Sequence, residues 1–338
     1  TCDEPDNLCP CCRIFGWVPP TGDEETSTTS RKGFVHFSMA KLDSEQDVKT
    51  HWATLKPLGK PQPSCWQFYL DAKNSGENGG YNDDAAVIRG RKFYWHQPDV
   101  EVKDVIDKRK EDNHKNLQPP DEQNKTVELL LPETIFTFTV DFENLSDAEL
   151  GLLLLTLQPN LLGEGNVPSM KLYHHFGMGK PLGLGSAEVK VDELTLINRE
   201  NRYQNLTADG KTSLEQNALT KSEVQRFIDT FVKESLAEQP CHSNTENERL
   251  QFTLMPHIEA LLLMLDWQHA PTQVRYPPGD KNPNSKKYWE SFHWFTHKNQ
   301  RGKKPKHMLL TPRDIVGIEQ QNPKRQFGFP PSRLSQSD

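Results

Sequence analysis

The sequence has no hydrophobic run of the roughly 18 residues that a membrane-spanning helix needs. Its longest apolar stretches, residues 150–157 and 258–265, are short enough to be buried helices instead. No signal peptide is recognisable, and the first residue is Thr1 rather than methionine. We therefore expect a soluble, cytoplasmic protein without a membrane partner, cut from a longer chain.

The chain also lacks an excess of positive charge, because 40 lysines and arginines stand against 47 carboxylates and the formal net charge is -7. This balance excludes nonspecific nucleic-acid binding through bulk charge. The charge is unevenly distributed, however: between Arg275 and Arg333, thirteen lysines and arginines stand against four carboxylates. A basic tail on an acidic chain favours a polyanionic partner, although a merely solvated tail explains it equally well.

Cysteine is rare, but four of the six cysteines fall within the first twelve residues. Disulfides are uncommon in the cytosol, so this spacing favours a metal site. Cys9 and Cys12 form a C-x-x-C pair, whose turn can direct both sulfurs at one Zn²⁺. Cys2 is the candidate third ligand and Cys11 is spare. The fourth ligand is left open, including a residue outside this chain, and a set of ordinary thiols is the alternative.

Strand patterns occur at three places along the chain. Residues 33–42 alternate in polarity, residues 134–142 are rich in β-branched and aromatic side chains, and residues 186–194 alternate again. Between the second and third strands lie a predicted helix and a glycine-rich loop. This order of strand, helix, loop and strand is half of a ferredoxin-like fold.

Two capping boxes predict where helices begin. In residues 146–149 and 220–223, a Ser or Thr is followed three residues later by Glu, so each side chain can bond the other's backbone amide. The first helix should end before Pro159. A further helix is predicted over residues 249–267, where Pro256 should kink or split it.

Four glycines crowd the ten residues 176–185, interrupted by Lys180 and Pro181. Glycine permits positive φ and lets a backbone approach a ligand closely, so such loops commonly face phosphates. This loop precedes a strand, which excludes the Rossmann and P-loop contexts. A long flexible hairpin is the alternative. The candidate ligand-facing glycines are Gly177, Gly179, Gly183 and Gly185.

A second basic segment combines cations with rings. Arg89, Arg91 and Lys92 precede the aromatic run 93–96. Cations beside stacking rings are what proteins use to recognise single-stranded RNA. An amphipathic strand whose cations extend to solvent is the competing interpretation.

Taken together, these motifs resemble the RAMP superfamily of CRISPR proteins. The family's Cys-rich knuckle, first strand, basic-aromatic segment and glycine-rich loop occur here in the same order, over roughly residues 9–195. They read CPCCRIFG, GFVHFS, IRGRKFYWH and FGMGKPLGLG, at Cys9–Gly16, Gly33–Ser38, Ile88–His96 and Phe176–Gly185.

The resemblance implies an α+β, ferredoxin-like (RRM-like) RAMP domain. This domain is incomplete at its N-terminus, because the elements that precede the knuckle in backbone-type members do not occur. We expect a zinc knuckle over 1–16, the RAMP domain over 17–200 and a helical, basic extension over 201–338. The extension resembles that of the single-protein type III-E effector (gRAMP, the RNase of Craspase). A subunit of a multi-subunit type III effector is the runner-up.

Family members grip a guide RNA, splay the guide–target duplex and cut target RNA with a loop aspartate, which this chain lacks. The resemblance therefore implies a chain that holds RNA without carrying catalytic residues. Its implied cofactor is structural Zn²⁺ on Cys2, Cys9 and Cys12. Its implied partners are guide RNA, single-stranded target RNA, the remaining RAMP domains of the effector and a caspase-like (TPR-CHAT) protease. The RNA-binding candidates are Arg89, Arg91, Lys92, Gly177, Gly179, Lys180, Gly183 and Gly185.

Two other functions stay open at this point. A metal-independent, guide-processing endoribonuclease of the RAMP class would use His174 or His175 as general acid or base. A protein-interaction module would use the helical tail to dock a partner, which is compatible with RNA binding elsewhere on the chain.

Overall fold

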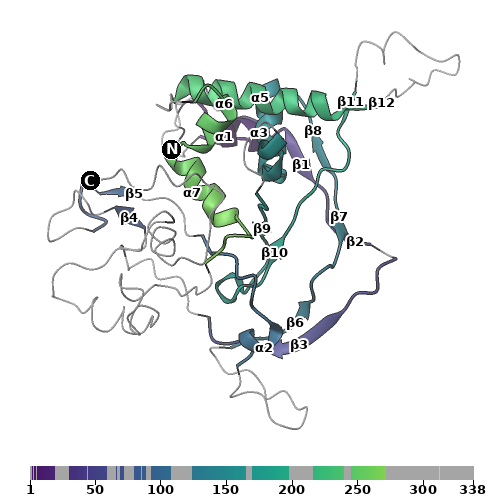
Figure 1. The fold of residues 1–338 in the computed structure, drawn as a ribbon. Helices are drawn as coiled ribbons and strands as arrows, with labels where there is room; N and C mark the ends of the chain where they lie inside the picture. Colours follow the sequence, from purple (N-terminus) through teal and green to yellow (C-terminus); the bar gives the residue numbers. More distant parts are fainter. Residues whose placement is uncertain are drawn as a thin grey trace, which may run out of the picture. The chain divides into compact units, whose positions relative to one another are not determined.

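The computed structural model describes residues 2, 4, 6–19, 30–43, 45–58, 66, 69–71, 80–84, 86–88, 93–107, 124–164, 170–197, 216–239, 245–271 and 312. Within them the chain is a mixed α+β protein with small two-stranded sheets (Figure 1). The described helices are α1 (Pro10–Phe15), α2 (Val102–Val105), α3 (Asp147–Leu157), α5 (Lys221–Glu238), α6 (Glu248–Thr253) and α7 (Pro256–Leu265), with the 3-10 helices η2 (Pro159–Glu164) and η3 (Lys180–Leu182).

The described strands pair in twos, and none of them joins a third strand. The pairs are β1–β8, β2–β7, β3–β6, β4–β5, β9–β10 and β11–β12. The strand bounds are β1 (Val35–Phe37), β2 (Lys41–Leu42), β3 (Thr50–Thr54), β4 (Leu70–Asp71), β5 (Val87–Ile88), β6 (Thr126–Leu130), β7 (Phe136–Thr137), β8 (Val140–Phe142), β9 (His174–His175), β10 (Ser186–Ala187), β11 (Thr195–Ile197) and β12 (Gln216–Ala218).

A one-residue bulge lies between the strand pairs β1–β8 and β2–β7. Phe37 lies opposite Val140 and Lys41 opposite Thr137, so the first strand advances one residue further than its partner between these points. Ser38 sits in this interval. Its amide donates to the Thr139 carbonyl at 2.9 Å, and its hydroxyl accepts the Thr139 amide at 2.8 Å. The strands predicted at 33–42 and 134–142 are therefore confirmed, each in two pieces.

Both predicted capping boxes are confirmed. The Ser146 hydroxyl accepts the Glu149 amide at 3.2 Å, and the Glu149 carboxylate accepts the Ser146 amide at 2.9 Å. Thr220 and Glu223 exchange the same two bonds at the start of α5. Helix α3 ends at Leu157, before the proline, as predicted.

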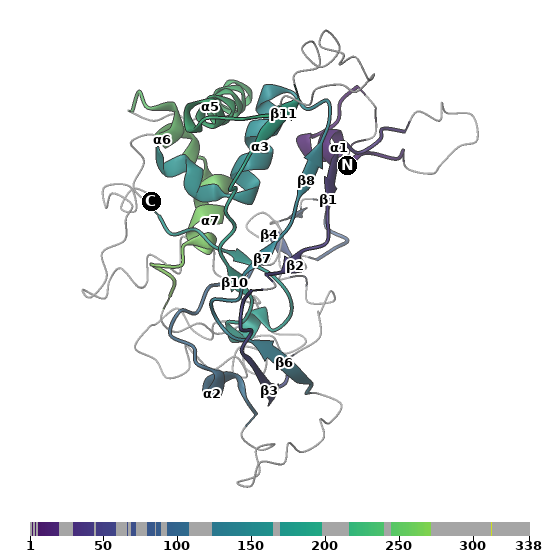
Figure 2. The same ribbon diagram turned by 90° about the vertical axis from the view of Figure 1, so that its right-hand side faces the viewer.

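Helices α3 and α5 pack directly against each other, and both views place them side by side (Figures 1 and 2). Gly151 marks the closest approach, because a Cβ atom built there would lie 2.1 Å from the Phe227 carbonyl oxygen. The α5 side chains Phe227, Ile228 and Val232 are buried. An exceptionally close helix crossing thus depends on the absence of one side chain.

The helix predicted over 249–267 is split at the expected place. Helix α6 ends at Thr253, and α7 begins with Pro256 in its first turn, where the missing amide hydrogen costs nothing. The predicted strand at 186–194 is wrong beyond Ala187. The Val191 amide instead donates to the Gln158 side-chain oxygen at 2.8 Å, so a helix terminus takes a donor that a ladder would need.

The chain divides into two compact units, and each unit is built from three separate segments of the sequence. Unit 1 comprises residues 1–51, 128–165 and 190–252, and unit 2 comprises 52–127, 166–189 and 253–338. Helix α5, from the predicted C-terminal extension, packs on α3 within unit 1. The domain ranges 1–16, 17–200 and 201–338 stay a prediction. Within the described part of the chain, none of the helices has the length and apolarity for crossing a membrane.

Candidate functional site

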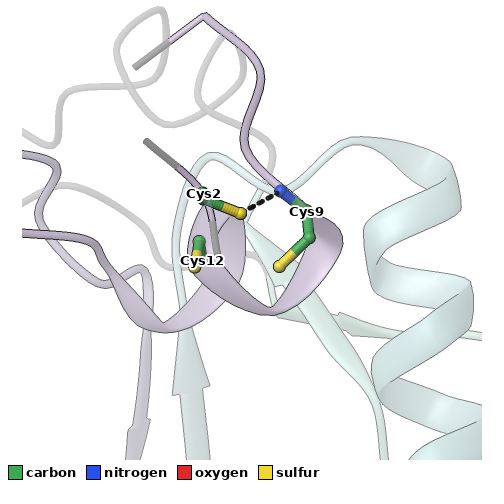
Figure 3. A group of neighbouring side chains, drawn as sticks. All are labelled: Cys2, Cys9 and Cys12. Atoms are coloured by element: carbon green, nitrogen blue, oxygen red, sulfur yellow. Dashed lines mark hydrogen bonds between the residues drawn. The ribbon is translucent and has the colours of Figure 1, made fainter. Parts of the chain in front are cut away.

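Three of the four N-terminal cysteines come together in unit 1. The sulfurs of Cys2, Cys9 and Cys12 all lie within 4.8 Å of one another. Figure 3 shows the three side chains gathered at the start of α1. Cys9 immediately precedes the helix and Cys12 lies one turn into it, which is how the C-x-x-C spacing places both sulfurs on the same side.

Hydrogen bonds fix Cys2 beside this helix although it lies outside it. The Cys9 amide donates to the Cys2 sulfur at 3.2 Å, which is the dashed line in Figure 3. The Trp17 indole donates to the Cys2 carbonyl oxygen at 2.7 Å. The third sulfur is therefore positioned by the backbone and by a buried tryptophan, neither of which the sequence motif revealed.

The thiols influence one another's protonation. The Cys12 amide donates to the Cys9 sulfur and lowers the pKa of that thiol. The Cys12 thiol donates to the same sulfur, and this bond raises the pKa of Cys12 to about 12. Without a cation, the cluster therefore gathers its negative charge on Cys9. A metal ion would have to displace the Cys12 proton to bind both sulfurs.

The donor set fits a soft or borderline cation such as Zn²⁺. Tetrahedral zinc with bonds of about 2.3 Å to sulfur holds its thiolates roughly 3.8 Å apart, so three corners need only a small contraction of this cluster. Among the described residues, no further His, Cys, Asp or Glu belongs to the group. Cys11, predicted as spare, lies outside it and is exposed.

The knuckle is tied to the start of α3. The Arg13 side chain of α1 forms an ion pair with Glu149 at 3.2 Å. Glu149 is buried and is also the capping-box residue of α3. Helix α1, which carries the cysteines, is therefore linked through Arg13 to the carboxylate that caps α3.

The glycine loop forms a closed hairpin in unit 2. His175 pairs with Ser186 and His174 with Ala187 at its base, and the Phe176 amide donates to the Gly185 carbonyl at 2.7 Å. At its tip, η3 is flanked by glycines. The four candidate glycines all have positive φ: Gly177 (67°), Gly179 (74°), Gly183 (88°) and Gly185 (81°).

Three of these glycines are needed for packing as well as for conformation. A Cβ atom at Gly185 would lie 1.9 Å from the Phe176 carbonyl oxygen. At Gly179 it would meet the Leu184 side chain at 2.6 Å, and at Gly183 the Gln97 side chain at 2.8 Å. Gly177 differs, because nothing lies within 4 Å of its Cβ position. Its neighbours Phe176 and Met178 are 53% and 77% exposed, so this edge of the hairpin is open.

The candidate cations are only partly accounted for. Lys180 begins η3 at the tip of the hairpin, is half-buried and forms no ion pair with the residues that the structure describes. Arg89, Arg91 and Lys92 lie outside the described residues, as does the basic segment 275–333. Whether they share a surface with the hairpin stays a prediction.

The histidine pair proposed for catalysis is placed unfavourably. His175 is half-buried, and among the described residues neither of its ring nitrogens has a partner in hydrogen-bonding geometry, although backbone groups of Leu184 and Tyr94 lie near. Burial lowers the pKa of His175. A lowered pKa leaves His175 neutral near neutral pH, which does not suit a general acid. His174 is half-buried, and catalysis by either histidine stays a prediction.

Sequence reasoning missed the residue that organises this region. His96, at the end of the basic-aromatic motif, is fully buried. Its Nδ1 lies 2.7 Å from the Ser186 hydroxyl, its Nε2 lies 3.0 Å from the Tyr173 carbonyl oxygen, and its ring stacks on His175. The available signal was a histidine following three aromatic residues, which favours a buried position.

Comparison with known proteins adds no relative. No protein-family model matches the chain, and no curated protein matches it either.

Proposed function

We propose that this chain is a non-cutting, RNA-holding scaffold of a CRISPR RAMP-type effector. The observation that carries the proposal is the glycine hairpin. Its tip combines Lys180, which forms no ion pair with the described residues, with an open backbone at Gly177, beside the exposed side chains of Phe176 and Met178. A backbone without a Cβ atom can approach sugar and phosphate closely, an ammonium neutralises phosphate, and an exposed ring can stack on a base.

The proposed fold is the ferredoxin-like RAMP domain. Strand β8, helix α3 and the hairpin strands β9 and β10 follow one another in the chain order that this fold requires. Cleavage aspartates would lie on other RAMP domains of the effector, which is why we assign no catalytic residue to this chain.

The cysteine cluster has a structural role in this proposal. Cys2, Cys9 and Cys12 would hold Zn²⁺, and the ion would stabilise α1, which is too short to be stable by itself. The remaining proposed partners are the guide RNA, target RNA and a caspase-like protease. The proposed site of action is the cytoplasm.

RNA affinity measured against salt concentration tests the proposal. The probe is a fluorescein-labelled single-stranded RNA of mixed sequence, with a second RNA of unrelated sequence for comparison. Each lost phosphate contact should reduce the slope of log K against log salt by about 0.7. We expect Lys180→Ala and the double variant Arg89→Ala/Arg91→Ala to flatten the slope, and to weaken both RNAs equally because phosphates carry no base identity.

The matched control is Lys108→Ala/Lys110→Ala, which removes the same charge from a stretch that the sequence predicts to be solvated. It should leave the slope unchanged. A flattened slope in this control, with unchanged slopes in the first two variants, would place RNA elsewhere on the chain. Absence of measurable RNA binding by the intact chain at low salt would contradict the proposed function itself.

A further inference from the structure

Among the described ionisable side chains of unit 2, His96 is the most enclosed, with none of its surface exposed. A carbonyl oxygen only accepts hydrogen bonds, so the contact with Tyr173 requires a hydrogen on Nε2. In the neutral ring Nδ1 then has no hydrogen and accepts one from the Ser186 hydroxyl. A neutral His96 therefore satisfies both of its partners without any rearrangement.

The His175 ring lies flat against this buried imidazole. The two ring centroids are 4.0 Å apart and the planes differ by 12°. Both His175 nitrogens are shielded from solvent and lack partners in hydrogen-bonding geometry among the described residues. A proton on either ring would put a charge in a site shielded from water, against the face of a second imidazole.

The surrounding charges compensate such a proton only in part, because the Asp266 carboxylate favours it while the other charged groups do not. Lys180 and His174, from the hairpin, add positive charge or none. The carboxylate that faces the pair is Asp266, after the end of α7, which is buried and already bonded. It accepts from the His269 ring at 2.8 Å and from the amides of Gln268 and His269 at 3.0 and 3.1 Å.

Hydrogen bonds connect the hairpin to two neighbouring segments. Its ladder has two residue pairs, closed by the bond between Phe176 and Gly185. The chain that enters β9 is held to the end of α7, because the Tyr173 amide donates to the Leu265 carbonyl at 2.9 Å and the Trp267 amide donates to the Lys171 carbonyl at 2.8 Å. Toward residues 93–97, the Gln97 side chain donates to the Pro181 carbonyl at 3.1 Å, and His96 reaches both sides of the hairpin, through the residue before β9 and the first residue of β10. The imidazole pair is therefore one of the ties between the hairpin and residues 93–97.

We propose that the stacked His96–His175 pair is an acid-sensitive latch, which holds the glycine hairpin 176–185 against residues 93–97 while both rings are neutral and releases it when they take up protons. Release would free the hairpin locally while unit 1 stays folded. The proposal concerns the hairpin alone and does not rest on the proposed RNA function.

The pKa shifts of the two histidines have the direction that the buried geometry predicts. Burial lowers the pKa of His96 to about 4 and also lowers the pKa of His175. A released histidine returns to its ordinary pKa of about 6.5. Because the latched pKa values lie below the released ones, the latch is fully stabilising above about pH 6.5 and weakens as the pH falls toward 4.

Hydrogen–deuterium exchange of the full chain tests the latch, because its pH dependence gives the number of protons that the histidines take up when the hairpin opens. Exchange of the peptide 170–188 is measured from pH 7.5 to pH 4.5, without RNA, and each rate is divided by the intrinsic rate at that pH. Between pH 6 and 5, opening should take up about one proton at His96 and up to one more at His175, so protection should fall by between one and two decades per pH unit. In His175→Phe the stacked ring stays but no longer titrates, and the fall should be about one decade per unit.

The matched control is His257→Gln, which removes an exposed histidine of α7 in the same unit and should keep the slope of the unaltered chain. Protection of 170–188 that does not change between pH 7.5 and 4.5 would overturn the proposal, as would a slope in His175→Phe as steep as that of the unaltered chain. Should that variant not fold, a ¹³C-histidine NMR titration of the unaltered chain decides, with the His96 and His175 signals assigned. Titration of these two imidazoles near pH 6.5 in the folded protein would contradict the latch.

Discussion

At the residue scale, the glycine hairpin uses one residue type for two different reasons. Gly177 has φ of 67° and open space where a side chain would begin. Gly185 has φ of 81° and would place a Cβ atom 1.9 Å from the Phe176 carbonyl oxygen. The first position is limited by backbone conformation alone, whereas the second is also blocked by the opposite strand.

Alanine at these two positions should therefore have unequal effects on folding. Gly177→Ala should cost about 1–2 kcal/mol, the penalty for a left-handed residue with a Cβ atom. Gly185→Ala should cost more, because the clash also breaks the bond that closes the hairpin. Urea unfolding of the two variants measures the difference. Equal destabilisation would show that the Gly185 contact is not as close as described.

The histidines illustrate what a sequence hides at this scale. His174 and His175 attract attention because they adjoin the glycine loop. The role of His96 depends on Tyr173 and Ser186, which lie 77 and 90 residues away from it in the sequence. No local pattern connects such positions, so its tautomer and its hydrogen-bond partners could not be predicted. The Cys9–Cys12 pair was predictable because its two sulfurs lie within one helical turn.

At the element scale, predictability also follows the range of the interactions. The capping boxes were predicted because each depends on residues three positions apart. The bulge at Ser38 was not, because it depends on register against a partner about a hundred residues away. The strand predicted at 186–194 failed for the same reason: alternation was present beyond Ala187, but a partner strand was not, and Gln158 took one of the amides.

The crossing of α3 and α5 gives the sharpest test at this scale. In an isolated helix, replacing glycine with alanine gains about 1 kcal/mol. Gly151→Ala should instead be destabilising by about 1–3 kcal/mol, because its Cβ atom would lie 2.1 Å from the Phe227 carbonyl and force the helices apart. The free energy of unfolding from urea titration measures the change.

Thr156→Ala on the same helix is the matched control, since Thr156 is exposed and bonds only the Leu152 carbonyl of its own helix. It should change stability by less than about 0.5 kcal/mol. A stabilising Gly151→Ala would mean that the two helices do not approach as closely as described, and that their packing depends on other contacts.

At the scale of the whole molecule, each of the two compact units is built from segments that are not consecutive in the sequence. A boundary near residue 200 follows from composition, where glycine and strand patterns give way to amphipathic helices. Contacts in space group α5 with α3, across that boundary, in unit 1. Composition reports what each segment is made of, whereas the units depend on which apolar faces meet, and only a structure supplies the second.

The cysteine cluster lies in unit 1 and the histidine pair in unit 2, so metal removal at constant pH and protonation of the histidines should act on different parts of the chain. We expect one zinc ion per purified chain by elemental analysis. Chelation at pH 7.5 should lower deuterium-exchange protection in residues 8–17 most, because a six-residue helix depends on its metal. Protection at the start of α3 should fall less, since it is reached through a partly exposed ion pair.

Peptide 170–188 of unit 2 should keep its protection when the metal is removed. Cys9→Ser/Cys12→Ser should behave like the chelated protein, because the donor atoms are lost rather than the ion. Cys11→Ser changes a neighbouring thiol outside the cluster and should retain both metal and protection. Equal zinc content in the double variant and the unaltered chain would rule out this metal centre. Loss of protection in 170–188 on chelation would show instead that the two units do not respond separately.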